Sequence, residues 1–501
     1  MADYSPMMKQ YFEVKEKNPN SILFFRLGDF YEMFFNDAKT VSQELDLTLT
    51  GRDCGQGERA PMCGIPFHSS ESYINRLLEK GYRVTICDQV EDPKTAKGLV
   101  KREVIRVITP GTVLESSMLE EGKNNYICSL CYGDGKVGFC VSDISTGELS
   151  VSEITGAGPR ELTRELENSL SRYSPREILI NPELTSLTEL GGFIKDRLHA
   201  SLECMDDSLY DGAKASAAVS KQFSGQTLEE LGINNKPLAV LALGALLEYL
   251  SRTQITGMER ITEVGLEAES SYMELDLNTM RNLELMETMR NKERKGSLLW
   301  VLDKTKTAMG KRLIRSWIER PLLSPAKITL RLNAVEELAT DRELLDGVVE
   351  QLTGIHDLER IMTRIVYGSA NGRELRSLCA ALDKLPGLKA VLERCESTLV
   401  KELNTQIDPL EDVAKLIDSA IDDDPPFSIR EGKLIKPGYS QELDAVRSDM
   451  PGGQALIASI EARERERTGI PKLKVGFNKV FGYYIEVTNS YKDQVPDDYI
   501  R

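Results

Sequence analysis

Two carboxylates stand close together in the stretch "VSDISTGELS", and their spacing could support metal chemistry. Asp143 and Glu148 could hold divalent cations for the hydrolysis of a phosphodiester, which would make the chain a metal-dependent nuclease. Alternatively, the two acids flank a polar Ser-Thr-Gly turn and have no chemical role. The second interpretation is favoured because no further acidic partner stands out in the sequence.

Other residues for catalysis or metal binding are sparse. The chain has three histidines, none at metal-ligand spacing from another histidine or cysteine, and no G-x-S-x-G nucleophile elbow. Its one C-x-x-C pair, Cys128 and Cys131, lies on a predicted strand, where residues three apart point to opposite faces. The sequence therefore predicts no catalytic residue and no metal site.

Phosphate-binding loops of the G-x-x-x-x-G-K-[ST] type are also absent. Each Gly-Lys pair, at 122–123, 135–136, 310–311 and 432–433, lacks a following Ser or Thr. A nucleotide-hydrolysing site needs such a loop or an equivalent, so no ATPase activity is indicated by these residues.

The stretch "RLGDFYEMFFNDA", residues 26–38, combines acids with a dense group of aromatic side chains. Asp29 and Glu32 have capping-box spacing, which predicts a helix beginning here with Glu32 as a cap. Phe34 and its apolar neighbours are then expected in the core. Local rules leave open whether one aromatic and one acid have a role outside the core.

Charge distribution is more informative than net charge. The chain of 501 residues carries a net charge of −16, which argues mildly against a nucleic-acid partner. Basic residues are nevertheless concentrated in segments 94–106, 281–320 and 470–492, which could follow a phosphate backbone or could be solvated surface. No apolar run is long enough to cross a membrane, and nine scattered cysteines suit a reducing compartment.

Hydrophobic periodicity divides the chain into regions of different character. The first 110 residues, and then about 122 to 250, alternate strand and helix patterns, and 237–250 reads as a buried helix. From about 260 the pattern is helical, with Leu375, Leu378, Leu382 and Leu385 expected on one helix face. A charged helix ending at Gly469 and two strands follow.

These stretches, taken together, resemble the MutS family of bacterial DNA mismatch repair proteins. "GDFYEMFFNDA" is similar to the family's mismatch-binding motif, Phe-x-Glu at the start of a helix. The resemblance covers essentially the whole chain and rests on further segments in the same order: "SPMMKQY", "APMCGIPFHSSESY", "QVEDPKTAKG", "VIRVITPGTV", "LLWVLDKTKTAMGKRLIRSWIERPL", and "EARERERTGI" followed by "LKVGFNKVFGYYIEV".

The resemblance implies a multidomain fold with α/β and all-α parts. The expected parts are a mixed α/β mismatch-binding domain at 1–112, an RNase H-like connector at 122–252, an all-α lever core at 258–438 and a small β-rich clamp at 439–501. "MPGGQ", residues 450–454, is a departure, because Pro451 is expected to break or kink the clamp helix.

The resemblance also implies roles for individual residues. Phe30 is expected to wedge beside a mispaired base, and Glu32 to hydrogen-bond to it, which at a purine N7 requires a protonated carboxyl group. Candidates for contacts to the DNA backbone are Arg52, Lys97, Arg102 and Lys492.

Partners and cofactors follow from the family as expectations. They are mismatched double-stranded DNA, a second copy in a homodimer and a MutL-type repair partner, with no membrane, in the bacterial cytoplasm at the nucleoid. The family's ATP and Mg²⁺ belong to an ATPase domain absent from these residues, so the chain is expected to be truncated and to need no cofactor itself. The alternatives are a family member that binds other DNA structures, the nuclease considered above, and a helical scaffold without DNA affinity.

Overall fold

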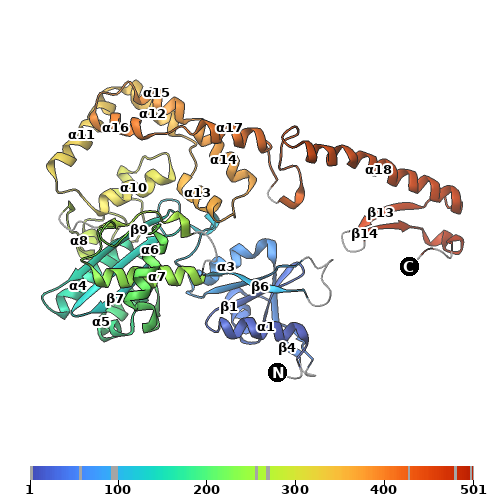
Figure 1. The fold of residues 1–501 in the computed structure, drawn as a ribbon, viewed down its shortest axis with the longest axis horizontal. Helices are drawn as coiled ribbons and strands as arrows, with labels where there is room; N and C mark the ends of the chain where they lie inside the picture. The colour runs from blue at the N-terminus through green and yellow to red at the C-terminus, as the bar shows by residue number, and fades with distance from the viewer. Residues whose placement is uncertain are drawn as a thin grey trace. The chain divides into compact units, whose positions relative to one another are not determined.

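The computed structural model describes residues 4–55, 59–91, 100–253, 258–266, 271–426, 429–478, 482–496 and 499. The chain divides into two compact units, Met1–Ala414 and Lys415–Arg501, and each is described by itself. The first unit contains two six-stranded sheets and a series of helices, and the second contains a long helix and a two-stranded sheet (Figure 1).

The first sheet has the strand order β3-β4-β2-β1-β5-β6. Only β1 and β5 pair in parallel, and the other neighbours are antiparallel. The strands are β1 (Ile22–Leu27), β2 (Phe30–Phe34), β3 (Thr50–Asp53), β4 (Arg59–Pro66), β5 (Val84–Gln89) and β6 (Arg102–Ile108).

Helices cover both faces of this sheet. On one face α2 (Phe35–Leu45) and α3 (Ser70–Glu79) bury Val41 and Leu77 against Tyr31 and Met33. On the other face α1 (Pro6–Lys17) packs Met8 and Tyr11 on Phe25 and Phe34. Both faces of β2 therefore lie in a core, except at the part of the strand that α1 leaves uncovered.

The second sheet has the order β11-β10-β7-β8-β9-β12. Helix α7 (Pro237–Thr253) packs on one face with α6 (Gly212–Gln222), and α4 (Pro159–Tyr173) packs on the other, as their apolar faces require. The strands are β7 (Tyr126–Gly133), β8 (Lys136–Asp143), β9 (Glu148–Thr155), β10 (Glu177–Ile180), β11 (Ser201–Cys204) and β12 (Gly265–Leu266).

Helices make up most of the remainder of the first unit. Most begin after a side chain that accepts a hydrogen bond from the first turn, as sequence capping rules predict. These caps are Asp276, Ser297, Thr307, Ser324, Asp341, Asp357 and Asn371. The helices are α8 (Leu277–Asn282), α9 (Leu298–Leu302), α10 (Ala308–Glu319), α11 (Pro325–Thr340), α12 (Arg342–Leu352), α13 (Leu358–Val366), α14 (Gly372–Leu382), α15 (Leu385–Leu392) and α16 (Thr398–Gln406), followed by α17 (Glu411–Ala420), which continues past residue 414.

The expectation of a single helix face from Leu375 to Leu385 is wrong. Helix α14 ends at Leu382 and α15 begins at Leu385, with a turn between them. Pro386 explains the break, because its ring nitrogen cannot donate to the carbonyl of Leu382.

The second unit contains α18 (Gln441–Thr468), β13 (Lys474–Asn478) and β14 (Gly482–Glu486). Gly469 ends α18 at a φ of 68°, as predicted, and Glu461 pairs with Arg465 in its last turns. The predicted break at Pro451 is wrong, because α18 continues through this residue to Thr468. The kink that Pro451 was also expected to cause stays a prediction.

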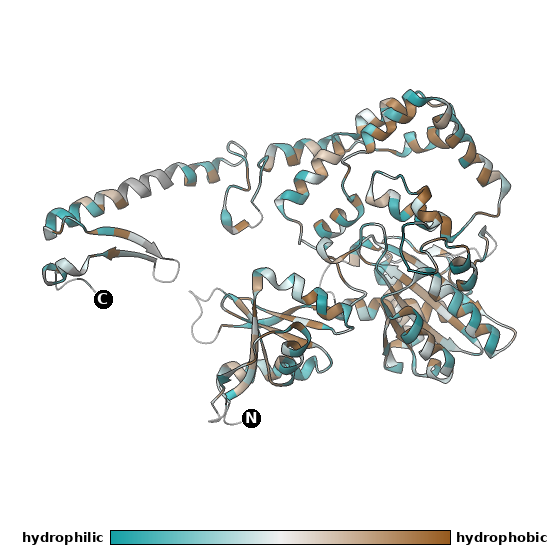
Figure 2. Cartoon of the chain, turned by 180° about the vertical axis from the view of Figure 1, so that it is seen from behind, coloured by the Kyte–Doolittle hydropathy of each residue, from teal (hydrophilic) through white to brown (hydrophobic). Residues whose placement is uncertain are grey.

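Hydropathy follows the architecture. Hydrophobic residues are concentrated on the strands of the two large sheets, whereas the coloured parts of α18 include many hydrophilic residues (Figure 2). Among the described residues, no helix is both long enough and apolar enough to span a bilayer.

Candidate nucleic-acid interface

Phe30 is an exposed aromatic residue on an otherwise buried strand. Its exposed fraction is 47%, whereas Phe34, on the same face of β2, is fully buried. The motif lies on strand β2 and not at a helix start, so the predicted capping role of Glu32 is wrong: α2 begins at Phe35 without a side-chain cap. Pairing of β2 with strands on both sides overrides the local capping signal.

The chain around Phe30 is held rigidly. Leu27 pairs with Phe30 across a two-residue turn, and Gly28 has a φ of 61°, which a residue with a side chain rarely adopts. The Arg26 side chain donates to the Gly28 carbonyl and its guanidinium lies 3.5 Å from the ring centroid of Phe67. These contacts present Phe30 at the tip of a fixed hairpin.

Glu32 lies two residues along the same face and is paired. Arg52 Nη1 donates to Glu32 Oε2 at 2.5 Å. The Glu32 side chain is 15% exposed and the Arg52 side chain 41%. Two of the residues predicted to contact DNA are therefore brought together, although 20 positions separate them.

Gly64 makes room for this arrangement on β4. It pairs with Glu32, and a Cβ at this position would lie 3.5 Å from Glu32 Cγ and 3.9 Å from Phe30 Cδ1. Sequence reasoning missed both Gly64 and Arg26. Only the pairing between strands brings these two residues to the site, and no local sequence pattern links either of them to Glu32.

The other predicted backbone contacts differ in their surroundings. Arg102 is buried, donates from Nε to the Arg26 carbonyl at 2.7 Å and from Nη1 to Gln10 and Val100, a geometry that supports the sheet and not a phosphate contact. Lys97 lies outside the described residues. Lys492 is exposed in a short helical turn, Asn489–Gln494, of the second unit.

Asp143 and Glu148 face each other across the β8–β9 hairpin but already have protein partners. Asp143 is fully buried and accepts from Ser145 and from the backbone nitrogen of Asn125. Glu148 accepts from Asn124 and Tyr126. These bonds favour the turn interpretation over metal binding.

No alternative site for metal chemistry is found in the described ranges. They contain no group of three or more His, Cys, Asp or Glu residues arranged to hold a metal ion. Cys128 and Cys131 point into the cores on opposite faces of the second sheet, as predicted.

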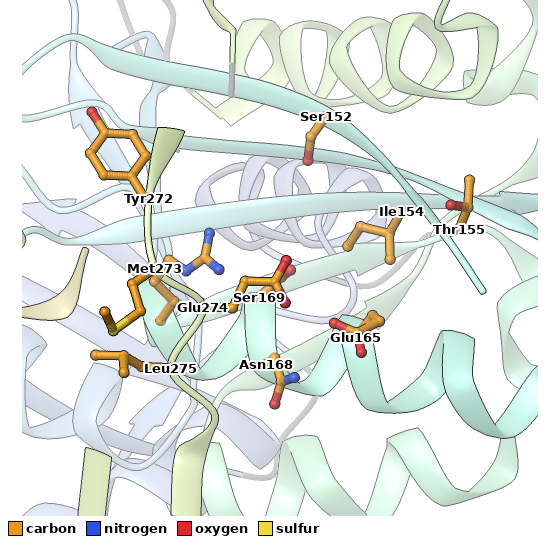
Figure 3. A pocket seen from close by; sticks show the side chains of 11 residues that line it. Ser152, Ile154, Thr155, Glu165, Asn168, Ser169, Tyr272, Met273, Glu274 and Leu275 are labelled. Carbon is orange, nitrogen blue, oxygen red and sulfur yellow. The ribbon is translucent and has the colours of Figure 1, made fainter. Parts of the chain in front are cut away.

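One hollow of about 210 Å³ lies between β9, α4 and the segment 272–275 (Figure 3). Its charged lining residues are Glu165, Arg172 and Glu274, and the lining contains no histidine or cysteine. The segment is held to the end of α10 by the bond from Met273 N to the Pro321 carbonyl. The hollow therefore offers no histidine to activate a hydroxyl group and lies on a different sheet from Phe30.

Three family models match the chain in sequence order, and they define its class as a protein built from MutS domains. MutS domain I matches residues 5–117, MutS domain II residues 125–262 and MutS domain III residues 278–478. The first sheet lies within the first match, the second sheet except β12 lies within the second, and α9 to α18 lie within the third.

Curated relatives agree over the whole chain. Proteins named "DNA mismatch repair protein MutS" are 48% identical in Acetivibrio thermocellus and in Ruminiclostridium cellulolyticum and 45% identical in Lachnoclostridium phytofermentans, each over 100% of this chain. The chain spans 57%, 57% and 53% of their respective lengths. This chain belongs to the MutS family, as the sequence resemblance predicted.

Proposed function

We propose that this chain binds duplex DNA and recognises mispaired or unpaired bases, as the first step of DNA mismatch repair. The observation that carries the proposal is Phe30, a large aromatic side chain that is 47% exposed at the tip of a fixed hairpin, two residues from an acid. The names of the relatives and the match to MutS domain I support it.

The aromatic face of Phe30 suits a probe that must respond to many mismatches. A phenyl ring stacks on any base, at roughly 1–3 kcal/mol per stacked base. Its insertion between base pairs costs a few kcal/mol of unstacking and kinks the duplex. Because a mispaired site is already weakened, this cost is lower there, and discrimination is mainly readout of deformability.

Glu32 would supply the polar contact to the displaced base. A purine N7 only accepts hydrogen bonds, so Glu32 must carry a proton to bond to it, and nearby phosphates favour the protonated form. At a matched site Glu32 would stay ionised and so could not donate a hydrogen bond to a purine N7.

The remaining assignments follow from the same family membership. We propose an RNase H-like connector at 122–252, a lever core at 258–438 and a clamp at 439–501, and that the protein acts as a homodimer with a MutL-type partner in the bacterial cytoplasm, at the nucleoid. ATP and Mg²⁺ would gate the clamp through an ATPase domain. These 501 residues contain no phosphate-binding loop of the G-x-x-x-x-G-K-[ST] type, so they are not proposed to bind the nucleotide.

The test compares the affinities of the protein for a G·T duplex, a single-base-bulge duplex and a matched duplex at one stated salt concentration. We expect Phe30→Ala to weaken mismatch binding by about tenfold or more, since one stacked base is worth roughly 1–3 kcal/mol. Ile105→Ala, an exposed apolar residue on β6 at the sheet edge, is the control and should retain discrimination.

Equal affinity of the wild-type protein for all three duplexes would contradict the proposed function. Full discrimination by Phe30→Ala would contradict the wedge role alone. Glu32→Gln should bind mismatches as well as the wild type or better, because the amide also donates a hydrogen bond.

A further inference from the structure

The ion pair between Arg52 and Glu32 competes with contacts that the same atoms could make to DNA. Arg52 Nη1 and Glu32 Oε2 are 2.5 Å apart, so this nitrogen and this oxygen are engaged with each other. A base that bonds to Glu32 Oε2, or a phosphate that draws the guanidinium away, must break this bond.

An incoming anion can reach the arginine of this pair more easily than the glutamate. The Arg52 side chain is 41% exposed, whereas the Glu32 side chain is 15% exposed, so an anion can approach the guanidinium before the carboxylate moves. Arginine has five N–H donors in a planar fork, and one of them, Nη1, donates to Glu32. A phosphate offers the guanidinium a charge-assisted hydrogen bond of the same kind as the carboxylate, so the arginine loses little in the exchange.

Arg52 lies on the same face of the sheet as Phe30, so the change of partner would take place on that face. Arg52 pairs with Ala60 on β4 and Glu32 pairs with Gly64 on the same strand, and because Ala60 and Gly64 are four residues apart, both side chains lie on one face of the sheet.

Resting on the proposed function, we propose that Arg52 is a specificity-determining residue that changes partner when a mismatch is engaged. In the free protein and on matched DNA it holds the Glu32 carboxylate. When Phe30 enters the duplex, Arg52 moves to a backbone phosphate and Glu32 turns to the displaced base. Mismatched DNA therefore gains one phosphate contact that matched DNA lacks.

Salt dependence of binding measures this difference directly. Each phosphate contact adds about 0.9 to the slope of log K against log salt concentration. With the full-length protein, Arg52→Gln should reduce the slope for a single-base-bulge duplex by about 0.9 and leave the matched slope unchanged. Arg52→Lys, which keeps the charge, should retain the wild-type slope, and thermal unfolding should verify that each variant is folded.

Glu32→Gln provides the reciprocal test. It frees Arg52 in every state, so the matched slope should steepen by about 0.9, and the double variant with Arg52→Gln should restore it. Arg59→Gln is the matched control, because it removes the same charge from an exposed position on the neighbouring strand β4. Its effect should be equal on both duplexes.

The proposal is overturned if Arg52→Gln changes both slopes equally or neither, or if Arg59→Gln reproduces its effect on the bulge duplex. Failure of the Arg52 proposal leaves the proposed function in place, provided that the wild type discriminates between the duplexes and Phe30→Ala does not. Loss of discrimination by the wild type itself would instead contradict the proposed function.

Discussion

Arg83 Nη2 lies 3.2 Å from Glu177 Oε1 and joins the first six-stranded sheet to the second. Glu177 is fully buried and also accepts from the Tyr249 hydroxyl at 2.7 Å, the Gly111 nitrogen at 3.1 Å and the Thr109 hydroxyl. A buried carboxylate requires such partners, and Arg83 also donates to Glu203, so the junction between the sheets is built on these two acids and one arginine.

Arg83→Gln should destabilise the protein strongly. It leaves the Glu177 charge buried without its cation, and removal of one partner from a buried pair typically costs about 3–5 kcal/mol. Arg164→Gln is the control, because Arg164 pairs with Glu165 on the surface and should cost about 1 kcal/mol or less. Urea unfolding followed by circular dichroism measures both, and equal losses would contradict the prediction.

Glu177→Gln should change how stability depends on pH. Burial raises the pKa of Glu177 above its ordinary value of 4.5, against the effects of Arg83 and three hydrogen-bond donors. The folded protein then binds the proton more tightly than the unfolded chain, so the contribution of Glu177 is greatest below pH 4.5 and declines as the pH rises through the raised pKa.

The measurement is the free energy of unfolding of wild type and Glu177→Gln across this range. We expect the wild type to lose stability relative to the variant as the pH increases from 4.5. Parallel pH profiles, or a relative gain by the wild type, would show that burial does not control this carboxyl group.

Local sequence patterns predicted most elements because their apolar faces are buried as the periodicity requires. Helix α7, for example, begins at Pro237, where the apolar run 237–250 predicted a buried helix. The capping interpretation of Glu32 failed because pairing between strands decides the structure of 30–34, and capping rules contain no information on pairing. Pro386 and Pro451 show the same limit: one proline separates two helices and the other lies within one.

The candidate site was only partly accessible from the sequence. Phe30 and Glu32 came from the family motif, and the 47% exposure of Phe30 agrees with a role outside the core. The contact from Arg52 to Glu32 could not be predicted, because it depends on the order β3-β4-β2, which no local pattern determines. The junction at Glu177 also joins segments far apart in the chain.

Gly138→Ala should destabilise the second sheet. A Cβ at Gly138 on β8 would lie 2.0 Å from the Leu238 carbonyl oxygen of α7, and a backbone atom cannot move aside cheaply. The cost should reach about 3 kcal/mol, the upper end of the range for overpacked sites. Gly191→Ala in α5 (Thr188–Phe193) is the control, because nothing lies within 4 Å and alanine should stabilise this helix by up to about 1 kcal/mol. Thermal unfolding distinguishes the two, and similar melting temperatures would contradict the close packing of α7 on β8.

Substitutions of Gly64 should separate folding from recognition. An alanine Cβ would lie 3.4 Å from the Tyr31 carbonyl oxygen and 3.5 Å from Glu32 Cγ, which are ordinary contacts, so Gly64→Ala should fold and discriminate. The additional methyl groups of Gly64→Val extend beyond that Cβ toward Phe30 and Glu32. If they displace the phenyl ring, the ratio of bulge to matched affinity should fall by about tenfold, as expected for loss of one stacked base.

Fluorescence anisotropy with labelled bulge and matched duplexes measures this ratio, and circular dichroism verifies the fold. Gly64→Ala is the matched control, because it changes the same position without reaching either side chain closely. A folded Gly64→Val variant with the wild-type ratio would mean that the placement of Phe30 and Glu32 over Gly64 is not required for recognition. Loss of the ratio in the alanine variant as well would mean that Gly64 itself is needed, for example to let the DNA backbone approach β4.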